Sequence, residues 1–97
     1  MRKTRSSPTY RAKARQRWRT KADFVKRYKL AAGCFDCGYA KAPEALQFDH
    51  VIGVKKGIIG KFLDKSWKQL LHEIDKCQVR CANCHAIKTK AEQYGPF

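Results

Sequence analysis

Two Cys-x-x-Cys pairs constrain this chain more than any other feature of its sequence. Cys34 and Cys37 form the first pair, Cys81 and Cys84 form the second, and 43 residues lie between them. Each pair brings two sulfur atoms to one point, so the two pairs together supply the four thiolates of a tetrahedral structural zinc site. Such a clamp would join the front of the folded domain to its last helix.

The length of the chain also favours a structural metal. The 97 residues allow one domain, whose small core leaves a narrow stability margin without a metal or disulfides. There is no secretory signal and no apolar run of membrane-spanning length, so we expect a reduced, cytoplasmic protein without a membrane partner. The alternative is a pair of redox dithiols, although one pair would serve for that. Cys77, the fifth cysteine, is expected to be a small buried hydrophobe.

The positive charge is concentrated in the first third of the chain. The net charge is +14, and residues 1–32 carry 12 Lys and Arg against one acidic residue. Residues 33–97 carry 10 basic and seven acidic residues. We therefore divide the chain into a basic arm, residues 1–32, and a domain, residues 33–97. This excess of positive charge predicts a nucleic-acid partner, the alternative being a solvated basic face with no partner.

The pattern of apolar and capping residues predicts a small α+β domain behind a basic helix. The helix should begin at Thr9 as its cap and stop at Gly33, with its first half projecting and its second half docked on the domain. Four further segments are expected: a strand at 46–51, a helix after a Ser66–Gln69 capping box, a strand at 77–80 and a helix at 86–91.

Three residues could form a hydrolytic centre beside the zinc clamp. Asp49 and His50 end the first expected strand, and His85 directly follows Cys84. Closure of the zinc site would bring this strand near the last helix, so the three side chains can converge. A carboxylate and an imidazole suit a hydrolytic divalent metal, and the second imidazole can act as a general base. The alternative for His50 is a structural histidine at a strand end.

Two other polar residues have less specific patterns. His72 lies on the polar side of its expected helix and is interpreted as a surface residue. Asn83 is the only asparagine in the chain, and inside a Cys-x-x-Cys turn it can simply be a turn residue.

Three segments together resemble the HNH endonucleases, most closely the small zinc-bearing type common in phage genomes. They are residues 46–51, 73–77 and 81–89, and the resemblance covers about residues 33–90. It implies the ββα-metal fold, in which two strands and a helix surround one divalent ion with a zinc clamp outside. It also implies endonuclease activity on DNA through a single metal ion such as Mg²⁺ or Mn²⁺.

The resemblance also implies individual roles at the site. Asp49 and His85 would hold the catalytic metal, and His50 would activate the attacking water, leaving 5′-phosphate and 3′-hydroxyl ends. In many family members an asparagine before the second Cys-x-x-Cys pair pins the loop between the strands. Asn83, the only candidate for this catalytic position, lies inside that pair, where it can instead order the turn beside His85.

We therefore expect a metal-dependent DNA endonuclease that nicks as a monomer or cuts both strands as a weak homodimer. The resemblance alone suggests a phage packaging (terminase) protein as a partner. The alternative is a non-catalytic, zinc-containing nucleic-acid-binding module. The expected phosphate contacts, which position DNA without reading its sequence, are Arg11, Lys13, Arg15, Arg17, Arg19, Lys21, Lys55, Lys56 and Lys61.

Overall fold

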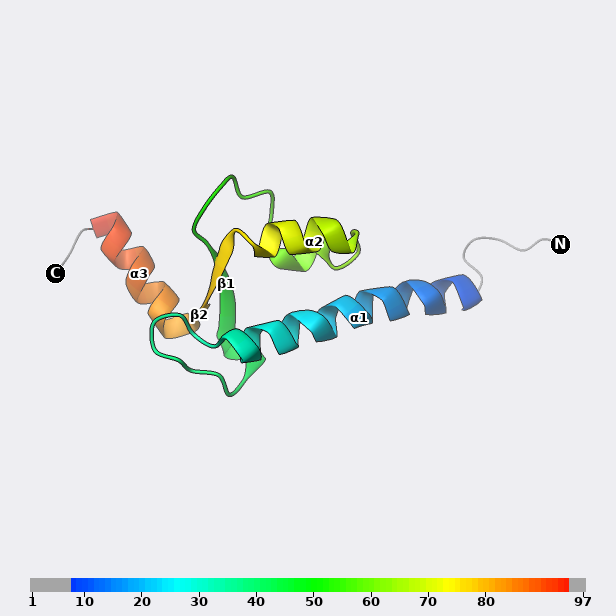
Figure 1. The fold of residues 1–97 in the computed structure, drawn as a ribbon, viewed down its shortest axis with the longest axis horizontal. Coiled ribbons are helices and arrows are strands. Elements are labelled where there is room, and N and C mark those ends of the chain that lie inside the picture. The colour runs from blue at the N-terminus through cyan, green and yellow to red at the C-terminus, as the bar shows by residue number, and fades with distance from the viewer. Residues whose placement is uncertain (1–7, 95–97) are drawn as a thin grey trace.

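Residues 8–94 form a small α+β arrangement of three α-helices and one two-stranded sheet (Figure 1). The computed structural model describes residues 8–94. Its elements are α1 (Pro8–Ala32), β1 (Leu46–His50), α2 (Trp67–Ile74), β2 (Cys77–Cys81) and α3 (Ala82–Tyr94), with short 3-10 helices at Pro43–Ala45 and Ile59–Phe62. None of the helices in this part of the chain is both long and apolar enough to cross a membrane.

Strands β1 and β2 are antiparallel, with Leu46 opposite Cys81 and His50 opposite Cys77. Because side chains alternate along a strand, the two faces of this sheet carry different residues. Phe48 packs against Tyr28 of α1, with ring centroids 5.9 Å apart, on the face that also carries His50. Asp49 points to the opposite face, toward α3. The sheet therefore separates two sets of polar side chains.

Helix α1 docks through its second half, as the sequence predicted. Phe24 meets Trp67 of α2 edge-on, with ring centroids 5.2 Å apart, and Val25 and Tyr28 pack on the same core cluster. The first part of α1 extends away from the sheet (Figure 1). The helix stops at Gly33, whose φ of +69° suits a glycine and whose amide donates to the carbonyl of Lys29 at 2.8 Å.

Two small apolar clusters form the core on either side of Phe48 and Tyr28. One is built from Ile59, Leu70 and Ile74. Leu70 and Ile74 belong to α2, which begins at the predicted capping box, in which the Ser66 side chain accepts from the backbone amide of Gln69. The other cluster contains the first cysteine of each pair, Cys34 and Cys81, together with Leu46 and Val79. The cysteine turns are therefore part of the core.

Two helix starts differ from the expectation. Helix α1 begins at Pro8, so Thr9 lies inside the helix and is not its cap. Proline suits a first turn because its missing N–H has no partner there anyway. Helix α3 begins at Ala82, four residues before the expected start. The Cys84 amide donates to Sγ of Cys81 at 3.4 Å, so this sulfur takes the place of a capping oxygen.

Candidate functional site

The four cysteines of the two pairs form one cluster that could hold a metal. Their Sγ atoms all lie within 4.8 Å of one another, and Sγ of Cys37 is 3.8 Å from that of Cys81. Four zinc–sulfur bonds of about 2.3 Å in a tetrahedron separate the sulfurs by roughly 3.8 Å. Cys77 lies outside this cluster and directs its thiol toward the Glu73 carbonyl, 3.5 Å away.

Backbone hydrogen bonds hold the first cysteine turn against the sheet. The Phe35 amide donates to the Val79 carbonyl of β2 at 2.7 Å, and the Gly38 amide donates to the Cys34 carbonyl at 2.9 Å. The Cys37 amide is 3.5 Å from Sγ of Cys34. These bonds attach the first cysteine turn to β2 and so position Cys34 and Cys37 beside the second pair.

The thiols of the cluster differ in acidity. Burial disfavours the Cys34 thiolate, but backbone hydrogen bonds, chiefly at Cys81 and Cys37, outweigh it and lower the pKa to about 6. The contact with the Cys81 thiol, followed by burial, raises the pKa of Cys84 to about 12. Neighbouring thiolates repel one another, so all four ionise together only around a cation.

Asp49 and His85 come together on the α3 side of the sheet. Oδ1 of Asp49 lies 3.5 Å from Nε2 of His85. Nδ1 of His85 donates to Oε1 of Gln47 at 2.7 Å, so Nε2 keeps its lone pair in the neutral ring. One ion with bonds of about 2.0–2.2 Å to nitrogen and oxygen can span this gap. These two atoms could therefore hold one divalent ion between them.

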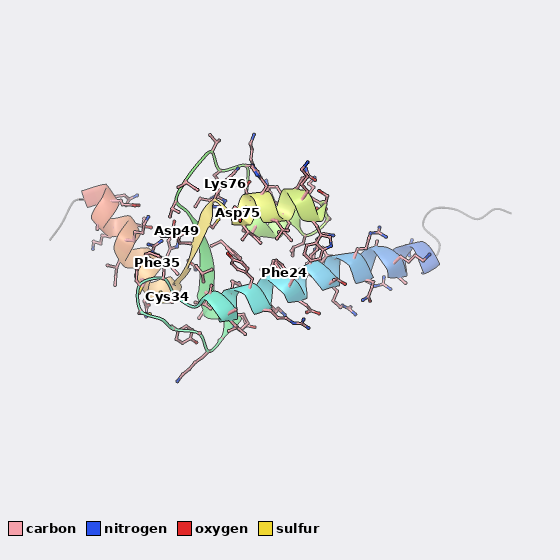
Figure 2. All side chains as sticks on the ribbon, viewed as in Figure 1. Phe24, Cys34, Phe35, Asp49, Asp75 and Lys76 are labelled. Atoms are coloured by element: carbon pink, nitrogen blue, oxygen red, sulfur yellow. The ribbon has the colours of Figure 1, made fainter. Side chains whose placement is uncertain are left out.

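The carboxylate of Asp49 also has two cationic partners that sequence reasoning missed. Its Oδ2 accepts from Nη1 of Arg80 at 2.8 Å and lies 3.2 Å from Nζ of Lys88. Figure 2 shows Asp49 on the strand pair, between the first cysteine turn and the loop above the sheet. Among the described residues, no group of three or more His, Cys or acidic side chains suits a metal except the four cysteines. Water and phosphate oxygens would have to complete a coordination shell at Asp49 and His85.

His50 does not join this pair. Its Nε2 lies 3.0 Å from Oε2 of Glu73 in α2, and within the described chain it has no hydrogen bond or ion pair with Asp49 or His85. Consecutive residues of a strand face opposite sides, so Asp49 and His50 diverge although they are neighbours. The expected convergence is observed for Asp49 and His85 only, with His50 at the same end of β1.

Two sequence candidates lie at the surface. Asn83 is exposed in the first turn of α3, and its side chain has no hydrogen bond within the described part of the chain. His72 is exposed, as expected. The loop after β1 is instead held by Glu73 and Lys76, as Oε2 of Glu73 accepts from the Lys56 amide at 2.9 Å and Nζ of Lys76 donates to the Val54 carbonyl at 2.7 Å.

The basic residues chosen from the sequence are exposed with one exception. Lys21 is only 7% exposed, and its ammonium sits 5.3 Å from the centre of the Trp67 ring. Its position three residues before Phe24 places it on the docked face of α1, where its stem is buried. It therefore does not belong to the open basic surface. The exposed residues are Arg11, Lys13, Arg15, Arg17, Arg19, Lys55, Lys56 and Lys61.

Protein-family models, curated proteins and solved structures were compared with this chain, and none of them matches it. The chain itself carries a cysteine cluster, a carboxylate–imidazole pair, a partly buried His50–Glu73 contact and an exposed basic surface.

Proposed function

We propose that this protein is a metal-dependent endonuclease that hydrolyses phosphodiester bonds in DNA. The pairing of Asp49 with His85 carries the proposal, because Gln47 leaves Nε2 of His85 free to bind a metal beside the carboxylate. A divalent ion such as Mg²⁺ or Mn²⁺ at this pair would stabilise negative charge on the scissile phosphate and on the leaving oxygen.

His50 is the proposed general base. It is the last residue of β1, and Nε2 of its ring is already bonded to Glu73. The other ring nitrogen, Nδ1, would take the proton from the attacking water. Attack on phosphorus with departure of the 3′-oxygen leaves 5′-phosphate and 3′-hydroxyl ends.

The exposed basic residues support a nucleic-acid substrate. Lys55 and Lys56 lie in the loop that directly follows His50, and both are exposed. The projecting part of α1 adds five exposed basic side chains between residues 11 and 19. Contacts from these groups to phosphates would position the duplex without selecting its sequence.

The cysteine cluster is proposed to hold a structural zinc ion. Four thiolates at this spacing match the tetrahedral preference of zinc, and such a shell keeps no position open for water. Its role would be to fix the start of α3, and with it His85, relative to β1. The chemistry is therefore assigned to the separate pair of Asp49 and His85.

The test is incubation of supercoiled plasmid with the zinc-loaded protein and Mg²⁺ or Mn²⁺, with EDTA as the metal-free control. Nicked or linear product that requires the added ion supports the nuclease, and Asp49→Ala, purified identically, must abolish it. DNA binding without cleavage in either metal would instead favour the non-catalytic zinc module. The ratio of nicked to linear product distinguishes single-strand from double-strand cutting.

A further inference from the structure

Glu73 is a buried acid with three polar partners, and it is not among the site residues predicted from the sequence. It lies in α2 and is 1% exposed. Its Oε1 accepts from Nζ of Lys76 at 2.9 Å, and its Oε2 accepts from the Lys56 amide at 2.9 Å. The same Oε2 lies 3.0 Å from Nε2 of His50. Both oxygens are therefore engaged, and one partner is the proposed base.

The ionisation of Glu73 determines the direction of its bond with His50. Burial disfavours the charged carboxylate, but hydrogen bonds from Lys76, the Lys56 amide and His50 outweigh it and lower the pKa to about 2. An ionised carboxylate only accepts hydrogen bonds, so Nε2 of His50 is the donor. In the neutral imidazole the unprotonated nitrogen is then Nδ1.

We propose that Glu73 is a positioning residue that fixes the Nε2–H tautomer and the ring orientation of His50, so that Nδ1 receives the proton of the attacking water. This inference rests on the proposed nuclease function. Glu73 itself touches neither water nor phosphate in this scheme. It acts through His50, in the way that the carboxylate of a catalytic triad orients its histidine.

The surroundings of Glu73 favour such a role because Lys76, which is bonded to the same carboxylate, also holds the chain beyond His50. The Val51 amide donates to the Lys76 carbonyl at 2.8 Å, and Nζ of Lys76 donates to the Val54 carbonyl at 2.7 Å. Figure 2 shows Lys76 where α2 meets β2, next to this loop. Glu73 thus holds the His50 ring, while pairing with Cys77 of β2 holds the His50 backbone.

The decisive measurement is the ¹⁵N spectrum of the His50 imidazole in the full-length, zinc-loaded protein, without added Mg²⁺ or Mn²⁺. The spectrum is recorded at a pH where the ring is neutral, and His50→Asn gives the assignment. A protonated Nε2 with an unprotonated Nδ1 is the expected result. The opposite tautomer, or an even mixture of the two tautomers, overturns the proposal. This measurement needs no substitution of Glu73.

A Glu73→Gln variant tests the consequence for catalysis. The neutral amide binds His50 more weakly, so the tautomer population should shift and the cleavage rate constant should fall about 10- to 100-fold with KM unchanged. Glu44→Gln, an exposed glutamate in the 3-10 helix before β1, should change neither quantity. An unchanged rate in a folded Glu73→Gln protein overturns the positioning role.

The two proposals fail in different ways. If the wild-type protein does not cleave plasmid with any divalent ion, the nuclease function fails, and so does the catalytic part of the inference. If the wild-type protein cleaves DNA but His50 carries its proton on Nδ1, only the role of Glu73 fails. Should Glu73→Gln not fold, the wild-type spectrum still decides the tautomer.

Discussion

Arg80 donates from Nη1 to Oδ2 of Asp49 at 2.8 Å, and this contact connects the cysteine cluster to the proposed catalytic carboxylate. The same guanidinium donates from Nε to Asp36, which lies inside the first cysteine pair, also at 2.8 Å. Arg80 is 5% exposed and directly precedes Cys81 in β2. The Arg80 side chain therefore links the first cysteine turn to Asp49.

Replacing Arg80 by methionine should destabilise the protein by about 3 kcal/mol, because it leaves the buried Asp49 without its principal partner. Urea unfolding of the zinc-loaded protein measures this change. Arg27→Met, at an exposed position of α1, is the matched control and should change stability by less than about 0.5 kcal/mol. Equal unfolding midpoints for the two variants would contradict the linking role of Arg80.

Loss of one cluster cysteine should prevent folding. Structural zinc contributes roughly 10 kcal/mol or more of apparent binding free energy, which a core of this size cannot replace. We expect Cys34→Ser and Cys84→Ser to be largely unfolded by circular dichroism and to contain little zinc. Cys77→Ser is the control, since this thiol lies outside the cluster, and it should retain one zinc ion per chain. A cooperative melt of zinc-free Cys84→Ser would contradict the clamp.

Substitutions of His50 and His85 should impair cleavage in different ways. His50→Ala removes proton transfer, which is worth about 10²–10⁴-fold in rate, but leaves the affinity for metal and DNA. His85→Ala removes a metal ligand and should raise the Mn²⁺ concentration needed for cleavage. His85→Asn should retain more activity than His85→Ala, because an amide oxygen still binds a hard cation.

Cleavage titrated with Mn²⁺ and the zinc content of each variant distinguish these outcomes. If His85→Ala loses zinc together with activity, the residue supports the cysteine cluster and is not a catalytic ligand. If excess Mn²⁺ alone restores His50→Ala, the base assignment is wrong.

The projecting part of α1 should supply much of the salt dependence of DNA binding. Changing its five exposed basic residues between positions 11 and 19 to glutamine should reduce the slope of log K against log salt by about 4, if each contacts one phosphate. The cleavage rate at saturating protein should stay unchanged, because no proposed catalytic residue lies in this part of α1. As the control, a variant in which Arg and Lys are exchanged for each other at the same five positions should keep the slope. A slope that the glutamine changes leave intact would exclude DNA contacts by this segment.

Acid should remove a stabilising contribution of Glu73. A free glutamate has a pKa of about 4.3, and in the folded protein hydrogen bonds that outweigh burial lower this pKa to about 2. The contribution, about 3 kcal/mol at most, is therefore complete above pH 4.3 and is lost as the pH falls to 2. The cysteine thiolates also take up protons in acid, so the comparison must be made between variants.

The quantity to measure is the difference in unfolding free energy between wild type and Glu73→Gln, at several pH values from 5 down to 2. This difference should shrink as the pH falls, whereas the difference for the exposed Glu44→Gln should stay small throughout. A difference for Glu73→Gln that is independent of pH would show that the carboxylate is not held in its charged form.

The elements that depend on local pattern were predictable from the sequence. The cysteine spacing indicated the four-sulfur cluster, alternation indicated β1, and Ser66 with Gln69 indicated the start of α2. Each of these signals lies within a few residues and reports a preference of the backbone or of a metal. The pairing of Asp49 with His85 also followed, because closure of the cysteine cluster brings β1 and α3 together.

Only the tertiary structure decided which polar groups surround the proposed site. Glu73 reads as an ordinary polar residue of an amphipathic helix, and Arg80 as one of many basic residues, yet both are buried and paired. Lys21 belongs to a basic run in the sequence but lies against Trp67. The environment of a charged side chain is set by segments far away in the chain, so local periodicity carries no record of whether that charge meets solvent or a buried partner.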